Sequence, residues 1–152
     1  MHRRRFVQIF ANLMATTIAT LCHSKFANAF WPAEHFAAGE FNTHFAHLFA
    51  NQSIIDSDDI EINLPEIAED GAVVPITISS NLDQISKIYI WVEKNPTPLA
   101  AEFELSMAVS AYLTARIKMA ESCNVVVIAQ QGERLLRRQR WVKVMQGGCG
   151  TG

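Results

Sequence analysis

The sequence is poor in cysteine and lacks the motifs of a self-contained catalytic site. Its 152 residues include 3 cysteines and no CxxC pair. The chain shows no Ser-His-Asp arrangement and no glycine-rich loop placed before a helix, as phosphate binding requires. These absences argue against a disulfide-stapled scaffold and against these kinds of active site.

Long hydrophobic runs are also missing. The most apolar stretch, about residues 6–21, is too short and too weakly apolar to serve comfortably as a permanent membrane anchor. It follows three arginines at positions 3–5 and precedes an A-x-A pattern at 27–29, which is typical of an export signal. We therefore predict a signal over residues 1–29. The paired arginines resemble the twin-arginine type, with ordinary secretion or an uncleaved anchor as alternatives.

Basic residues become scarce once such a signal is removed. Residues 1–29 hold four basic residues and no acidic one, so the mature chain keeps 9 basic against 15 acidic residues, a net charge of −6. This charge makes nucleic acid a poor partner. The basic residues that remain concentrate on the last predicted strand: Arg134, Arg137, Arg138, Arg140 and Lys143. This strand is either a solvated sheet face or a docking surface for an acidic partner or an anionic substrate group.

Strand patterns dominate the mature chain. Ile60, Ile62 and Leu64 alternate with polar residues, and turn residues separate the runs that follow. The predicted strands are about 60–64, 72–79, 85–93, 102–110, 112–119, 124–130 and 134–146. Seven short strands at this spacing favour an all-β fold, an immunoglobulin-like antiparallel β-sandwich. Pro75 cannot donate to a ladder, so its strand should lie at an edge or be bulged there.

A helix is expected before the strands. Residues 33–50 place Phe41, Phe45, Leu48 and Phe49 at helical spacing, with an interruption near Gly39. The predicted organisation is a signal at 1–29, an N-terminal helical segment at 30–56, a β-sandwich at 57–146 and a flexible glycine-rich arm at 147–152.

Histidine offers a weak indication of a metal site. His44 and His47 stand three apart on the expected helix, and His35 or a carboxylate would have to complete the ligand set. No residue is fixed as a third ligand, so a polar helix face is the simpler interpretation, and we predict no metal and no other cofactor.

The two cysteines of the mature chain differ in their surroundings. Cys123 precedes the apolar run VVVIA and is expected to be a small buried or turn residue. Cys149 lies in GGCGTG, between Gly148 and Gly150 and close to Gly147. A glycine-rich tail cannot hold a general base beside the thiol, and a free thiol is mostly protonated at neutral pH. Cys149 is therefore either a cysteine that is incidental or forms a disulfide, or a thiol activated inside another protein.

Four stretches of the chain resemble the SoxY family, the sulfur-carrying subunits of periplasmic thiosulfate oxidation. They are IEINLPEIAEDGAVVPITI (60–78), IYIWVEKNPTPLAAEFEL (88–105), ARIKMAESCNVVVIA (115–129) and WVKVMQGGCG (141–150). The resemblance implies an immunoglobulin-like sandwich and a non-catalytic carrier in which sulfur intermediates are conjugated to Cys149. The family's usual GGCGG ending is here GGCG followed by Thr151 and Gly152.

The resemblance also implies partners and a location. It implies a heterodimer with a SoxZ-like subunit, the enzymes SoxAX, SoxB and SoxCD, thiosulfate-derived cargo, and a periplasmic protein without a membrane contact after export. We expect either the alternating Ile88, Ile90 and Val92, taken as exposed, or the Phe-rich helix to form the subunit interface. The alternative from a different class is a secreted immunoglobulin-like binding module without carrier activity.

Overall fold

The computed structural model describes residues 5, 8, 32–50 and 52–145. The predicted signal at 1–29, apart from residues 5 and 8, and the predicted arm at 147–152 lie outside this part of the chain. The residues from Pro32 onward form one compact unit. No helix in the described residues is long and apolar enough to cross a membrane.

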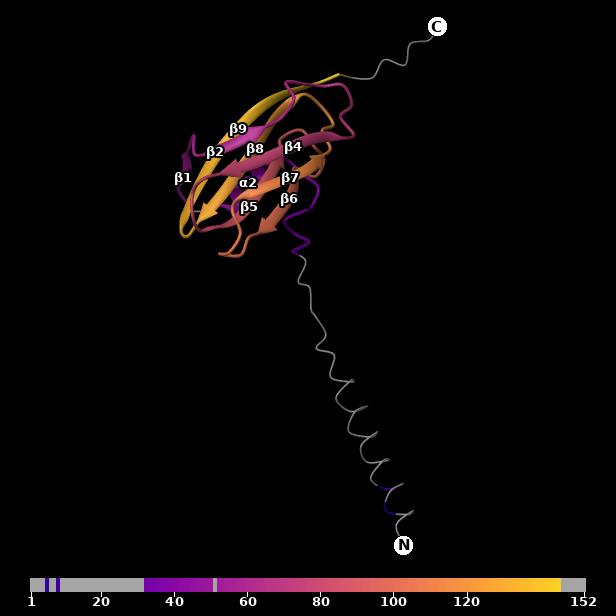
Figure 1. Cartoon of the computed structure of the whole chain (residues 1–152). Coiled ribbons are helices and arrows are strands. Elements are labelled where there is room, and N and C mark those ends of the chain that lie inside the picture. Colours follow the sequence, from indigo (N-terminus) through magenta and orange to yellow (C-terminus); the bar gives the residue numbers. More distant parts are fainter. Residues whose placement is uncertain (1–4, 6–7, 9–31, 51, 146–152) are drawn as a thin grey trace. The chain divides into compact units, whose positions relative to one another are not determined.

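One short helix and nine strands make up the described elements (Figure 1). They are α2 Phe41–Leu48, β1 Ile54–Asp56, β2 Ile60–Asn63, β3 Ile67–Ala68, β4 Val74–Ser80, β5 Ile85–Val92, β6 Leu99–Glu104, β7 Tyr112–Ile117, β8 Cys123–Gln131 and β9 Arg134–Val144. The helix that was expected in 33–50 is confirmed at α2, and the seven predicted strands correspond to β2 and β4 to β9.

The strands form two layers. One sheet has the order β1-β9-β8-β5-β6, with β3 also paired to β9, and the other has the order β2-β4-β7. The pairs among the predicted strands are antiparallel, whereas β1 and β3 both run parallel to β9. The all-β, immunoglobulin-like sandwich is therefore confirmed, and the parallel pairs belong to the two short strands that the sequence did not predict.

The main core lies between the two sheets. Alternate residues of β2, β4, β5, β8 and β9 point into it, and Val74, Ile90 and Val127 are fully buried there. Such alternation is the pattern of strands that turn one face to a core. Because β5 contributes Ile88, Ile90 and Val92 to this core, the expectation that these residues form an exposed subunit interface is wrong.

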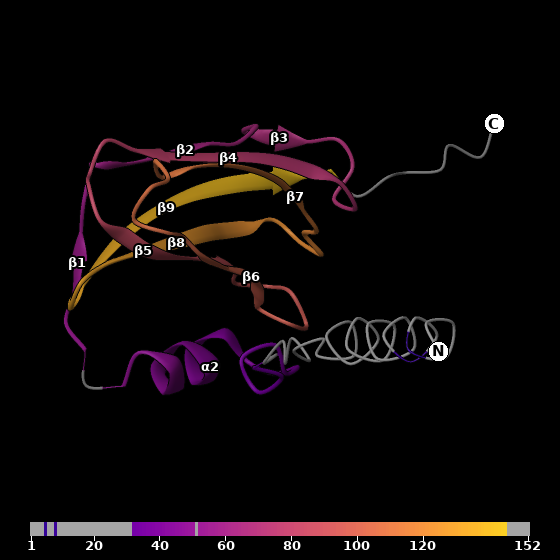
Figure 2. The same cartoon turned by 60° about the horizontal axis from the view of Figure 1, so that its bottom comes forward.

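A second core covers the opposite face of the larger sheet. Trp91 is fully buried there, and its ring lies 5.8, 5.4 and 6.2 Å from the rings of Phe41, Phe45 and Phe49. Figure 2 shows α2 on this side of the larger sheet, away from β2, β4 and β7. The Phe-rich helix thus packs against its own sheet with its phenylalanines partly buried, and the alternative expectation that this helix forms the subunit interface stays a prediction.

Two local expectations need adjustment. The strand expected at 102–110 is β6, which spans Leu99–Glu104, because the chain turns at Ser106, whose carbonyl accepts from Val109 N at 3.1 Å and whose hydroxyl accepts from Ala108 N at 3.3 Å. β4 is the middle strand of its sheet rather than an edge. Its ladder with β2 stops at Thr77, however, so Pro75 has only β7 as a neighbour.

Trp91 offers a direct test of the second core. Its indole Nε1 is buried without a hydrogen-bond partner in the structure. Trp91→Ala is expected to lower the free energy of unfolding by about 3–5 kcal/mol through loss of aromatic packing. Trp91→Phe should cost much less, because the unpaired N–H contributes no bond. Denaturant unfolding of both variants checks this, and equal losses would contradict the packing described.

Candidate functional site

The predicted site residues Gly147, Gly148, Cys149 and Gly150 lie outside the described residues. The description ends at Met145, directly after β9 and four positions before Cys149. The segment from Lys143 to Met145, here called the arm root, is therefore the described segment closest in sequence to the candidate thiol.

The arm root is held from both sides. On one side β3 pairs with β9, and the Met145 N–H donates to the Ala68 carbonyl at 2.9 Å. On the other side the Val144 N–H donates to the Ser122 hydroxyl at 2.9 Å, and this hydroxyl donates to the Val144 carbonyl at 3.4 Å. The backbone is thus hydrogen-bonded up to Met145, two residues before the predicted arm begins.

The backbones at Gly71 and Met119 approach each other closely beside the arm root. The Met119 N–H donates to the Gly71 carbonyl at 2.8 Å. A Cβ at position 71 would lie 2.4 Å from the Met119 carbonyl oxygen and 2.8 Å from Cγ1 of Val144, distances at which side-chain atoms do not pack. Position 71 therefore needs glycine so that three chain segments can meet beside the arm root.

Two of the five basic residues of β9 pair with carboxylates at the end of β1 and in the turn after it. Arg137 donates from Nε and Nη2 to the two Asp56 carboxylate oxygens at 2.6 and 3.0 Å, which lowers the pKa of that carboxyl. Arg138 pairs with Asp58. Arg140 differs, because it donates to the Ile62 carbonyl at 3.4 Å. Two of the five basic side chains of β9 therefore form ion pairs with carboxylates of the chain itself.

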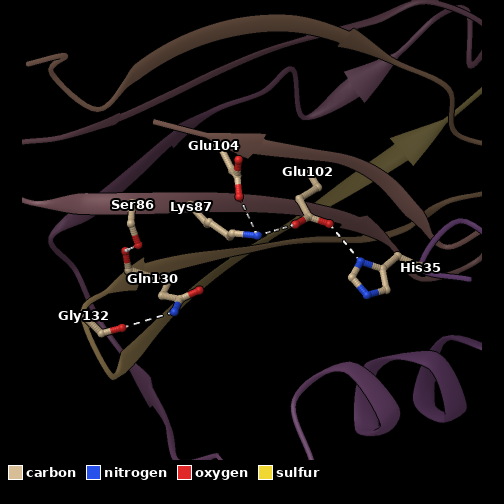
Figure 3. Close-up of polar contacts among 7 residues, drawn as sticks. All are labelled: His35, Ser86, Lys87, Glu102, Glu104, Gln130 and Gly132. Atoms are coloured by element: carbon tan, nitrogen blue, oxygen red, sulfur yellow. Dashed lines mark hydrogen bonds and ion pairs between the residues drawn. The ribbon is translucent and has the colours of Figure 1, made fainter. Parts of the chain in front are cut away.

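A polar cluster clamps the N-terminal segment onto the outer face of β5 and β6 (Figure 3). Glu102 receives a contact from His35 Nδ1 at 3.0 Å and one from Lys87 Nζ at 3.0 Å, and Lys87 also reaches Glu104 at 3.0 Å. Burial raises the pKa of Glu102, but the hydrogen bonds from His35 and Lys87 outweigh it and leave the pKa lowered. Lys87 has a raised pKa, chiefly because of its hydrogen bond to Glu102.

The histidines do not assemble a metal site in the structure. His35 is bound to Glu102, and His44 Nε2 lies 3.3 Å from the Ala38 carbonyl. Gly39, at a φ of +155°, packs directly against the His44 ring. No group of three histidine, cysteine or carboxylate side chains in the described residues is arranged to bind a metal ion.

Cys123 is unsuited to surface chemistry. It is 1% exposed at the start of β8, as expected for a small buried residue. Burial raises the pKa of its thiol, which disfavours the nucleophilic thiolate. Within the described residues it is the one free cysteine, so the fold itself presents no accessible thiol.

The arrangement defines an immunoglobulin-like β-sandwich whose last strand leads into a cysteine-bearing tail. The model of the family described as sulfur oxidation protein SoxY matches residues 45–149, more than half of the chain. The chain therefore belongs to the SoxY family, as the resemblance implied.

A solved structure agrees with this assignment. The chain is similar to the sulfur carrier protein SoxY from Chlorobium limicola f thiosulfatophilum, with 34% sequence identity and a TM-score of 0.62. The match covers 70% of this chain and 96% of that one. No curated protein matches the chain.

Sequence reasoning identified the tail but missed the residues that hold its root. Ser122 bonds to Val144 across 22 positions, and Gly71 approaches Met119 through the backbone. Neither contact has a local motif. The polar turn at Ser122 and the isolated Gly71 were visible only as turn signals.

Ser122→Ala tests the arm root. The variant leaves the half-buried Val144 N–H without its partner, at a local cost of about 1–3 kcal/mol. Amide hydrogen exchange at Val144 should therefore become faster, while exchange at Val127 in the middle of β8 should stay slow. Ser106→Ala, which removes an equivalent bond in the turn after β6, serves as the control and should leave Val144 unchanged.

Glu102→Gln tests the polar cluster. Because folding lowers the pKa of Glu102, its stabilising contribution is present above the unfolded-state pKa and is lost as the pH falls through the folded-state pKa. The variant should be less stable than the parent at neutral pH, and the difference should shrink below about pH 4. Glu104→Gln, at a carboxylate whose side chain is 77% exposed, should change little. A pH-independent deficit for Glu102→Gln in urea unfolding would contradict the account.

Proposed function

We propose that the chain is a covalent carrier of sulfur intermediates in thiosulfate oxidation, with the substrate conjugated to Cys149 and presented to partner enzymes. The main support is that the family match extends to residue 149 and so includes the tail cysteine. The similar solved structure is described as a sulfur carrier protein. The burial of Cys123 supports the same choice by elimination, since Cys22 falls within the predicted signal.

The chemistry requires help from outside the chain. The Cys149 thiol loses its proton and bonds to the terminal sulfur of thiosulfate, while two electrons pass to an acceptor in the partner enzyme. Water then attacks the sulfonate sulfur, and the bond between the two cargo sulfurs breaks with its electron pair going to the sulfur bound to Cys149. Sulfate and two protons leave, and a persulfide remains on Cys149. Tail glycines supply no base, electron acceptor or oxyanion donor side chain, so the chain's own contribution is to hold and deliver the thiol.

The length of the tail between Met145 and Cys149 limits how far the thiol can move from the fold. Four residues after Met145 span at most about 13–14 Å when fully extended. The thiol can therefore act only in a site whose entrance lies close to the arm root. The absence of Cβ atoms at Gly147, Gly148 and Gly150 allows the tail to be narrow, which suits entry into a channel.

Further parts of the proposal rest on the family. We propose that the chain is exported to the periplasm through a signal at residues 1–29 and forms a heterodimer with a SoxZ-like subunit. In this proposal it delivers its cargo to the enzymes SoxAX, SoxB and SoxCD. Export of a folded complex on one signal would let a partner without a signal cross the membrane with this chain. The carrier itself performs no catalysis in this scheme.

Intact-mass measurement tests the carrier role. After incubation with thiosulfate, an electron acceptor and the partner enzymes, the parent chain should gain the mass of a thiosulfate-derived adduct. Cys149→Ser should gain none, because it lacks the acceptor thiol. Cys123→Ser is the matched control and should be loaded like the parent. Adduct on Cys149→Ser, or no adduct on the parent, would overturn the proposal.

A further inference from the structure

The outer edge of β9 has a gap that its short neighbours leave open. β1 pairs with Leu135 to Arg137, and β3 pairs with Lys143 and Val144. Between these two pairings the chain leaves as β2 to join the other sheet. Residues 138–142 of β9 therefore have no strand beside them on this side within the described chain, and we call this stretch the edge window.

Backbone groups in the edge window point outward. The Arg137 carbonyl accepts from Ser57 at 2.9 Å, and the Lys143 and Met145 N–H groups donate to Glu66 and Ala68 at 2.9 Å each. Odd-numbered residues of β9 thus direct their backbone groups to the side of β1 and β3. By the alternation of a strand, Gln139 and Trp141 present their N–H and C=O groups to the edge window. Unpaired edge groups of this kind are a template for strand addition.

The edge window opens into a surface groove of about 900 Å³. Its apolar lining includes Trp141 and Ile67, which are 59% and 54% exposed, and Met145 at the arm root is 48% exposed nearby. Four basic and three acidic side chains line the groove. Arg137 and Arg138 are paired with Asp56 and Asp58, which leaves Arg140 and Lys143 against Glu66. The groove therefore combines two exposed apolar side chains, Trp141 and Ile67, with one more basic than acidic side chain.

We propose that the edge window binds an extended, acidic segment of the enzyme that receives Cys149, added as a strand beside β9. The inference rests on the proposed carrier function. Two observations select this occupant. The excess of basic side chains favours acidic residues in the incoming segment. The tail leaves from Met145, four residues past Trp141, so an enzyme that takes up Cys149 within about 14 Å docks near the end of β9 at which the edge window lies.

The dimensions suit strand addition. From Arg137 to Lys143 the ladder advances six residues, about 20 Å at ~3.3 Å per residue, which accommodates an extended segment of about five residues. Such a segment meets the backbone groups of Gln139 and Trp141, and its alternate side chains lie over Trp141 and Ile67. In strand addition, main-chain bonds supply affinity and side-chain contacts supply specificity. Tryptophan is one of the residue types that most often carry the binding energy of an interface, so Trp141 should contribute strongly.

Paired surface variants test the proposal. The probe is the purified enzyme that loads Cys149 in the intact-mass assay, and its Kd for the full chain is measured at low salt. Trp141→Ala and Lys143→Glu should each weaken binding about tenfold or more. Tyr112→Ala and Arg116→Glu make comparable changes, an aromatic truncation and a charge reversal, on exposed residues of β7 in the other sheet and should leave the Kd within about twofold. Equal effects of the two pairs would overturn the proposal.

A proline pair tests the backbone bonds separately. Gln139→Pro removes an N–H that faces the edge window, and an edge position tolerates proline when its N–H is not in the ladder. Thr114→Pro makes the equivalent change on β7, whose only neighbour is β4. With circular dichroism to confirm folding, Gln139→Pro should weaken enzyme binding about tenfold and Thr114→Pro should not. If either proline variant fails to fold, the two surface pairs decide.

The outcomes separate this inference from the carrier role. If the parent chain is loaded at Cys149 but the edge-window variants bind the enzyme normally, the inference fails and the carrier role stands. If the parent is not loaded, the carrier role fails. If the edge-window variants instead lose self-association or a copurifying SoxZ-like subunit while keeping enzyme affinity, the occupant is a second copy or the partner subunit, and the inference is overturned.

Discussion

The antiparallel ladder between β8 and β9 is the interaction on which the rest of the structure depends. Nine residue pairs join the two strands, from Cys123 opposite Val142 to Gln131 opposite Arg134. The same strands supply both cores, with Val127 and Leu136 turned toward the smaller sheet and Ile128 and Leu135 toward α2. Because this ladder fixes β9 along its length, it also fixes where the tail leaves the fold.

In the proposed carrier role, this firmly paired strand complements a thiol that is activated by the partner enzymes. In the described fold the polar side chains that form ion pairs hold chain segments together. Glu102 binds His35 of the N-terminal segment, and Arg137 pairs with Asp56. The Cys123 thiol is buried. In the proposed carrier role, the reactive group is delivered on a short tail from a fixed origin. A short tail from a fixed origin limits the sites that can use the cargo to those that dock close by.

Most of the sandwich could be predicted because its long strands carry their own pattern. The nearly continuous apolar runs of β5 and β8 and the phenylalanine spacing of α2 are local properties of the sequence. β1 and β3 are only three and two residues long, so they carry no period, and they form because β9 offers an edge. Ile88, Ile90 and Val92 were misjudged because one face of this apolar run was taken as exposed. Local pattern does not say which distant elements cover the two faces of β5, which are the smaller sheet on one side and α2 on the other.

The central claim is that the fold presents the Cys149 thiol without activating it. It is tested most directly by following the intact mass of the parent chain with thiosulfate and an electron acceptor, in the presence and absence of the partner enzymes. The account predicts a thiosulfate-derived adduct on Cys149 only when the enzymes are present. Adduct formation at the same rate without them would contradict it, because the chain would then activate its own thiol.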